Sequence, residues 1–213
     1  TFRFLLGNLN AADFDPKKDM VSYENLEPVD QYIMIELNRV IEKTVSSVLE
    51  YDYIDANKTL VNFMTNELSS YYCDFTKDIL YCSAKTDLRR RQVQSVFWQC
   101  TDALVKLWAP FLVYTMEEVW MHFTDDSVES VHYAHFPTPV HYENEEEIRS
   151  MFTDLLSVRD DVLKALEEAR ADKTIGTSQE AEVQLTVTEE ENELLEKGLK
   201  GEAAQWMIVS KAT

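Results

Sequence analysis

The sequence predicts a mainly α-helical protein, an antiparallel helical bundle followed by a small α/β unit. The chain has 213 residues, 45% of them hydrophobic, which is enough to bury a substantial core. Only 4 glycines and 5 prolines interrupt it, and this favours long helices. Near the C-terminus the apolar spacing changes from every third or fourth residue to strict alternation at Val183, Leu185 and Val187. We therefore place the bundle in residues 1–140 and the α/β unit in residues 141–213.

Four long helices are expected in the bundle. The first covers about residues 29–50, after a loop-like stretch at 13–28 that is rich in Asp, Asn and Pro. Asp55 is the candidate N-cap of the second helix, and Asp87 is the candidate N-cap of the third. Pro110 suits the first turn of the fourth. Short links between amphipathic helices predict antiparallel neighbours.

The C-terminal third changes its pattern. Residues 124–144 predict a loop-rich link, and a long helix is expected at about 145–171. Alternating apolar and polar residues predict a strand at 182–188, followed by an acidic helix at 189–200. The last apolar run predicts a second strand near 206–210. The expected order is therefore helix, strand, helix, strand.

Composition excludes several classes of protein. A net charge of -19 argues against nucleic-acid or membrane binding over the whole surface, although a local basic face is compatible with it. No apolar run is long enough to span a membrane, and nothing resembles a signal peptide. The cysteines are odd in number and form no CxxC pair, which favours a reducing compartment and no zinc site: Cys73, Cys82 and Cys100. Because the chain opens without Met on an apolar run, we expect a segment of a longer protein that starts inside a helix.

Motifs of known enzyme chemistry are absent from the sequence. No P-loop, dinucleotide-binding glycine pattern or GxSxG occurs. His132 and His135 form an H-x-x-H pair that also resembles a degraded His-x-Gly-His, but Ala134 replaces the glycine. A zinc site would need further ligands, so we interpret this pair as a structural contact. Trp98, Trp108 and Trp120 lie at helical spacing and are assigned to the core. We name no catalytic residue and no metal ligand.

A cluster of cations stands out against the acidic background. Its members lie within fifteen residues of one another: Lys77, Lys85, Arg89, Arg90 and Arg91. Three consecutive arginines near the start of a helix oppose the helix dipole, so local stability does not favour them. Two interpretations remain open from these residues alone. The cations either pair with acidic neighbours on the bundle or contact the phosphates of a nucleic acid.

Short motifs along the whole chain, among them Ala109-Pro110-Phe111 and Glu117-Glu118-Val119-Trp120, carry a resemblance to the tRNA-binding C-terminal region of bacterial-type isoleucyl-tRNA synthetases. Ala109-Pro110-Phe111 and Glu117-Glu118-Val119-Trp120 resemble a signature shared by the class I synthetases for isoleucine, valine, leucine and methionine. Residues 167–183 resemble the junction after the bundle in the isoleucine enzyme. Further segments of resemblance are residues 3–9, 68–81, 88–91, 131–132 and 136–137.

This resemblance implies a bundle of the class I anticodon-binding type that docks the anticodon arm of tRNA(Ile). It also implies that the remainder of the synthetase chain is a partner, that the protein is a cytoplasmic monomer, and that ATP with Mg serves the full-length enzyme. Neither adenylate-forming motif, His-x-Gly-His or Lys-Met-Ser-Lys-Ser, is present, and the editing domain and the Cys-rich zinc module are absent. We therefore expect no cofactor and no ligase activity in this chain alone. The same resemblance makes Lys77, Lys85, Arg89, Arg90 and Arg91 candidate tRNA contacts.

Two alternatives accompany this prediction. The chain could be the same region of a valyl-tRNA synthetase, because part of the signature is common to both. It could also be a helical protein-interaction module whose acidic surface binds a basic partner and no RNA. A coherent basic surface over residues 77–91 favours RNA, and a uniformly negative surface favours the interaction module.

Overall fold

The computed structural model describes residues 1–10, 12–123 and 128–213. Contacts divide the chain into two compact units. Unit 1 contains Thr1–Leu26 and Ile33–Tyr142, and unit 2 contains Glu27–Tyr32 and Glu143–Thr213. None of the helices in these described ranges combines the length and the apolar character that a membrane span requires.

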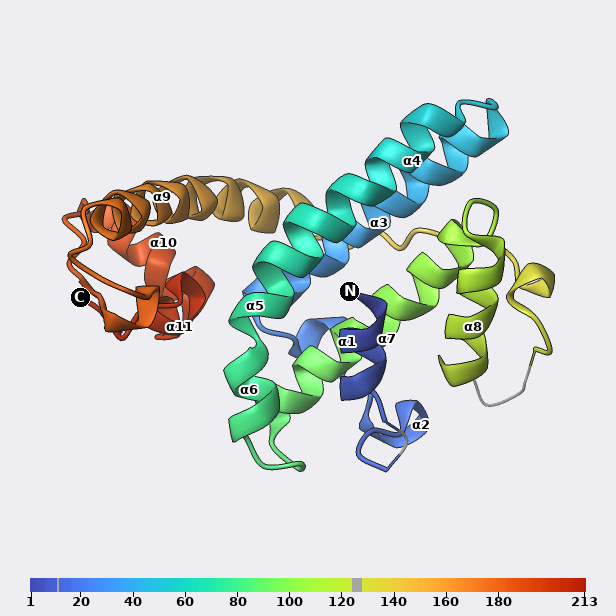
Figure 1. Ribbon diagram of the computed structural model, residues 1–213, viewed down its shortest axis with the longest axis horizontal. Coiled ribbons are helices and arrows are strands. Elements are labelled where there is room, and N and C mark those ends of the chain that lie inside the picture. The colour runs from blue at the N-terminus through green and yellow to red at the C-terminus, as the bar shows by residue number, and fades with distance from the viewer. Residues whose placement is uncertain (11, 124–127) are drawn as a thin grey trace. The chain divides into compact units, whose positions relative to one another are not determined.

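Unit 1 is a helical bundle (Figure 1). Its helical segments, with α3 beginning in unit 2, are α1 (Phe2–Asn8), α2 (Pro16–Asp19), the 3-10 turn η1 (Tyr23–Asn25), α3 (Pro28–Leu49), α4 (Tyr53–Asn62), the π-helical η2 (Phe63–Tyr72), α5 (Cys73–Phe75), α6 (Lys77–Cys82), α7 (Leu88–Trp108), α8 (Val113–Phe123) and the 3-10 turn η3 (Val131–Tyr133). The chain reverses between α3 and α4, where Asp55 binds Lys43 at 2.6 Å and Ser47 at 2.8 Å. The predicted helical bundle is confirmed.

Of the three helix starts predicted at Asp55, Asp87 and Pro110, one is confirmed and two are wrong. The Asp87 carboxylate accepts from the backbone N–H groups of Arg89 and Arg90, so the predicted cap of α7 is confirmed. The cap predicted at Asp55 is wrong, because Asp52 accepts from the Asp55 N–H at 3.0 Å and α4 starts at Tyr53. Pro110 is not in the first turn of α8. It lies in a turn held by the Trp108 carbonyl, and α8 begins at Val113.

The second bundle helix widens in its middle. The apolar spacing predicts one continuous α-helix, but Phe63–Tyr72 winds as a π-helix between α4 and α5. Its inward side chains still include Phe63, Leu68 and Tyr72, so the predicted apolar face is kept. The wider turn is a backbone adjustment that side-chain periodicity does not reveal.

Aromatic side chains fill the core of unit 1. Phe97 is fully buried and makes edge contacts with Phe4 and Tyr72, each with ring centroids 5.8 Å apart. Trp120 is 4% exposed, and its Nε1 donates to the Val128 carbonyl at 2.9 Å. This confirms the predicted core position of Trp120.

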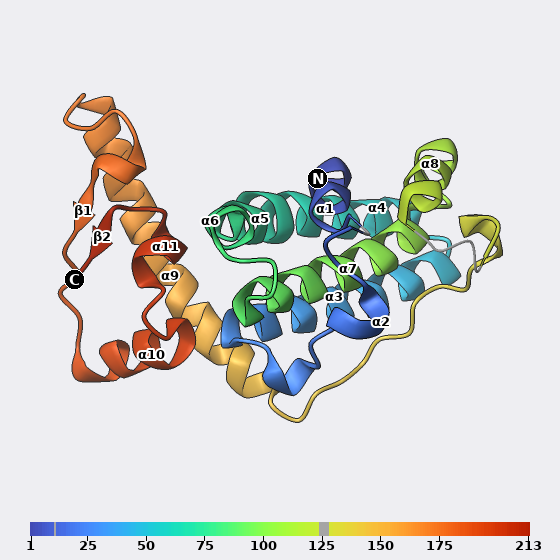
Figure 2. The same cartoon turned by 90° about the horizontal axis from the view of Figure 1, so that it is seen from below.

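Unit 2 is built on the long helix α9 (Figure 2). Its further elements are the 3-10 turn η4 (Ser178–Glu180), β1 (Glu182–Val183), α10 (Glu189–Leu199), α11 (Ala203–Met207) and β2 (Lys211–Ala212). Helix α9 runs over Glu145–Ala171 as predicted, and α10 and α11 pack against it. β1 and β2 pair in parallel, with Glu182 opposite Lys211.

The predicted strands need correction. The strand expected at 182–188 is present only as Glu182–Val183, extended by one hydrogen bond from the Leu185 N–H to the Thr213 carbonyl at 2.7 Å. The strand expected near 206–210 is wrong, because Trp206 lies in α11 and the strand lies at Lys211–Ala212. Trp206 is fully buried, and a short apolar run buried on all sides suits a helix turn as well as a strand.

Candidate nucleic-acid interface

The first turn of α7 explains how three consecutive arginines are tolerated there. The Asp87 carboxylate lies 2.8 Å from the Arg89 N–H and 3.4 Å from the Arg90 N–H. A negative charge at the N-cap satisfies these donors and offsets the repulsion between the helix dipole and the cations. The same stretch of chain therefore contains both the unfavourable cations and the group that compensates for them.

Arg90 is largely buried and paired. Only 14% of its side chain is exposed, and its Nη2 donates to the carboxylate of Asp13. Its Nη1 donates to the Ser83 carbonyl at 3.1 Å. A guanidinium that is out of water and has two anchored partners is held in one orientation.

Arg91 is held in the same way. Its side chain is 15% exposed, and its Nη1 donates to the Asp13 carbonyl at 2.6 Å and to Gln94 at 2.7 Å. The guanidinium lies 5.8 Å from the centre of the Phe14 ring, and its Nη2 is 3.8 Å from Asp19. Both arginines therefore bind the segment that contains Asp13.

Polar side chains along α7 continue this pattern. Gln92 donates to the Asn25 carbonyl at 2.7 Å, Gln94 donates to the Asn8 carbonyl at 2.9 Å, and the Ser95 hydroxyl accepts from the Val21 N–H at 2.9 Å. We call this set the α7 clamp: Arg90, Arg91, Gln92, Gln94 and Ser95. It satisfies backbone groups of the stretch between α1 and α3, which contains little regular structure of its own. The clamp fixes that stretch against α7.

The remaining predicted cations lie closer to solvent. Lys77 is 51% exposed, and its hydrogen bond to Asp74 raises its pKa, so the ammonium stays charged. Lys85 is 68% exposed, with its Nζ 3.8 Å from the Asp13 carboxylate. Arg89 is half-buried and donates to Gln92 at 3.3 Å. Ion pairs this exposed contribute little to stability, so Lys77 and Lys85 can exchange their carboxylates for other anions.

Two lysines outside the predicted cluster lie on an element that packs against α7. Lys17 and Lys18 are exposed on α2, within the clamped stretch. Sequence spacing could not reveal this, because only the clamp brings residues 13–19 against α7. Together, residues 13–19 and 74–91 contain seven cationic and six acidic side chains. This region is therefore close to neutral in a chain with a net charge of -19.

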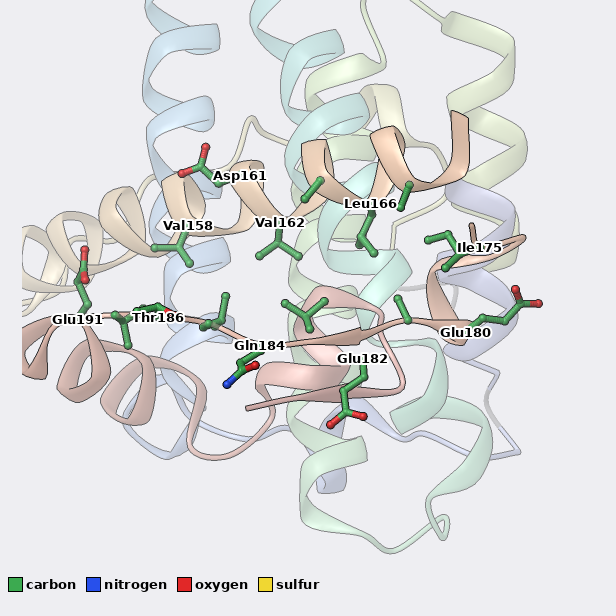
Figure 3. Close-up of a pocket in the computed structure, with 16 residues that line it drawn as sticks. Val158, Asp161, Val162, Leu166, Ile175, Glu180, Glu182, Gln184, Thr186 and Glu191 are labelled. Carbon is green, nitrogen blue, oxygen red and sulfur yellow. The ribbon is translucent and has the colours of Figure 1, made fainter. Parts of the chain in front are cut away.

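Unit 2 contains a cavity of different character (Figure 3). It has a volume of about 650 Å³ and lies between α9 and residues 180–187. Val158, Val162 and Leu166 point from α9 toward the strand segment. Its charged lining residues are acidic: Asp161, Glu180, Glu182 and Glu191. Without a cation in the described lining, the cavity does not suit a phosphate or a nucleotide.

The histidine pair shows no catalytic arrangement. His132 lies in η3, 38% exposed, with its Nε2 4.0 Å from Glu117. That Glu117 carboxylate also accepts from the Ser130 hydroxyl at 2.9 Å, and His135 is exposed. Within the described ranges, no three His, Cys, Asp or Glu side chains gather in a way that could hold a metal ion.

Comparison with known proteins identifies the family. Residues 30–185 match the family described as the anticodon-binding domain of tRNA ligase. The chain is 44% identical over 211 residues to an isoleucine–tRNA ligase of Bacillus licheniformis. This match covers 99% of the chain and 23% of the relative. It is 44% identical to the ligase of the same name from Bacillus subtilis and 42% identical to that of Lactobacillus johnsonii, covering 100% of this chain in each case.

The chain spans less than a quarter of the length of these relatives. The matches to ligases named for isoleucine extend over both units, and they do not favour the valine alternative. The family match begins within α3 and ends after β1, so the stretch that the α7 clamp holds lies before it. The chain belongs to the family of anticodon-binding domains of tRNA ligases.

Proposed function

We propose that this chain is the tRNA-docking region of an isoleucine–tRNA ligase and that it holds the anticodon arm of tRNA(Ile). The supporting observation is the similarity to ligases named for isoleucine along the whole chain, together with the family match over residues 30–185. The catalytic part lies elsewhere in the longer protein. In this proposal, ATP and Mg are used there, and the intact enzyme is a cytoplasmic monomer.

The proposed docking surface consists of α6, its connection to α7 and the start of α7. Lys77, Lys85 and Arg89 are its direct phosphate contacts in this proposal. The side chains of Lys77 and Lys85 are 51% and 68% exposed, and Arg89 follows them at the start of α7. Phosphate contacts fix the position of the RNA without reading its sequence. Because this region is near neutral and the rest of the chain is strongly acidic, RNA meets the least repulsion here.

Arg90 and Arg91 have a double role in the proposal. Their guanidinium groups hold Asp13 and its neighbours, and their charge adds to the local potential that attracts RNA. Replacing either by Ala is therefore expected to lower both protein stability and tRNA affinity. Replacing Lys77 and Lys85 is expected to lower tRNA affinity alone, because their side chains are more than half exposed.

The test uses filter binding of tRNA(Ile) and tRNA(Val) to the intact protein, together with charging assays on both. Preferential binding and charging of tRNA(Ile) supports the proposal. The Lys77→Ala, Lys85→Ala, Arg89→Ala triple variant should reduce the slope of log K against log salt by about two units. The matched control is Arg39→Ala, Lys43→Ala, Lys58→Ala, which removes the same charge from α3 and α4. Equal binding of the two tRNAs, or equal effects of the two triple variants, contradicts the proposal.

A further inference from the structure

The short helix α2 contains two lysines on a backbone that local hydrogen bonds hold in place. The Asp15 carboxylate accepts from the Lys17 N–H at 3.0 Å, Pro16 stands in the first turn, and the Asp15 N–H donates back to Asp19 at 2.8 Å. Lys17 and Lys18 thus project from a backbone that is closed by reciprocal hydrogen bonds. Preorganised cations lose less conformational entropy on binding than cations on a loose loop.

Lys18 can bind an anion at little cost. Lys18 is 79% exposed and pairs with Asp15 at 2.7 Å across one turn. A pair of this kind contributes little to stability, so its ammonium can turn to a stronger anion. Lys17 also lines a groove of about 1850 Å³ in unit 1, whose lining contains equal numbers of lysine or arginine and of acidic residues: Arg3, Lys17 and Lys106, and Asp15, Asp102 and Glu118. Because Lys106 pairs with Asp102 at 2.7 Å, the inference is carried by the lysines of α2 and not by the charge of the groove.

The position of α2 depends on the α7 clamp. Asp13 is two residues before the cap of α2, and both its carboxylate and its carbonyl are held by Arg90 and Arg91. Asp19, at the end of α2, lies 3.8 Å from Arg91. The arginines therefore set where Lys17 and Lys18 stand relative to Lys85 and Arg89.

We propose that Lys17 and Lys18 of α2 form a second phosphate-contacting site for tRNA and that Asp13, through Arg90 and Arg91, is its positioning residue. The inference rests on the proposed function. It extends the surface from one stretch of α7 to an element that is distant in sequence. The recognised chemistry is the RNA phosphodiester backbone.

The lysines are tested in the intact protein with a tRNA(Ile) transcript in filter binding over a range of salt. Lys17→Ala, Lys18→Ala is expected to weaken binding by about tenfold and to reduce the salt slope by roughly 1.5 units. Its matched control is Lys43→Ala, Lys58→Ala, which also removes two exposed lysines, one of them paired with a carboxylate at 2.6 Å. The control should change binding by less than about twofold. Equal changes in the two variants overturn the inference while leaving tRNA binding by the wild type intact.

The positioning role of Asp13 and its negative charge predict opposite effects of one substitution on tRNA affinity. Asp13→Asn removes a negative charge, so electrostatics alone predicts tighter binding of RNA. Loss of the ion pair with Arg90 predicts weaker binding, because one of the contacts that hold the segment before α2 against α7 is weakened. Weaker binding, with a smaller effect when Lys17 and Lys18 are already Ala, supports the role of Asp13, and tighter or unchanged binding overturns it. If the wild type fails to bind tRNA at all, the proposed function itself is refuted.

Discussion

Truncating Trp120 is expected to destabilise unit 1 strongly. Its side chain is 4% exposed, its Nε1 donates to Val128 at 2.9 Å, and the Lys106 ammonium lies 5.8 Å from its ring. A buried Trp removes roughly 200 Å² from water. At about 25 cal/mol per Å² this gives about 5 kcal/mol as an upper limit. Because some relaxation follows truncation, we expect Trp120→Ala to lower the free energy of unfolding by about 3–5 kcal/mol.

Urea denaturation followed by circular dichroism measures this change. Trp120→Phe keeps most of the ring but leaves the Val128 carbonyl without its donor, so a loss of about 1–2 kcal/mol is expected. The control is Met121→Ala on the neighbouring position, whose side chain is 68% exposed and whose loss should lie within about 0.5 kcal/mol of the wild type. If Trp120→Ala behaves like Met121→Ala, the assignment of Trp120 to the core is wrong.

Three further predictions concern activity, thiols and pH. The 213-residue chain alone should show no isoleucine-dependent ATP–pyrophosphate exchange, because both nucleotide motifs are missing from it; exchange that copurifies with the chain contradicts this. A soluble thiol reagent should modify only Cys82 in the folded chain and all three cysteines in denaturant, because burial raises the pKa of Cys73 to about 12 and also raises that of Cys100. Burial, with Glu36 nearby, raises the pKa of Glu67 above its ordinary 4.5, so the ionised carboxylate disfavours the folded state at neutral pH. Glu67→Gln should therefore raise the urea midpoint of unfolding at about pH 7. This gain should disappear below about pH 4, where Glu67 is protonated in both the folded and the unfolded state. An equal gain at both pH values refutes the raised pKa of Glu67.

Sequence patterns were sufficient where the determinants are local. The long helix α9 follows the apolar spacing of residues 145–171, and Asp87 caps α7 with a carboxylate only two residues from the N–H it binds. The alternation at Val183 located a strand, although only Glu182–Val183 pairs with a partner. Helix periodicity and capping depend on neighbours within a few residues, and these can be seen in the chain itself.

The prediction from sequence was wrong where a short apolar run is buried on all sides, because such a run does not reveal whether it forms a helix or a strand. The run at 206–209 looks like a strand because it is short and apolar, but Trp206 is enclosed within α11, and the Arg159 guanidinium lies over its ring at 5.6 Å. Likewise, Pro110 precedes α8 by three residues because the turn after Trp108 closes first. The outcome at Trp206 depends on Arg159, which lies 47 residues away in the sequence, whereas the outcome at Pro110 depends on which of two local turns forms.

The candidate site divides in the same way. Composition and clustering alone determined that residues 77–91 are unusually cationic for a chain with a net charge of -19, and the family resemblance came from the sequence as well. Only the tertiary structure decided that Arg90 and Arg91 are enclosed, because their partner Asp13 lies 77 residues from Arg90 along the chain. The same long-range pairing placed Lys17 and Lys18 on an element packed against α7. A sequence reports which charges exist, whereas desolvation and pairing, which decide how each charge acts, arise only when distant segments meet.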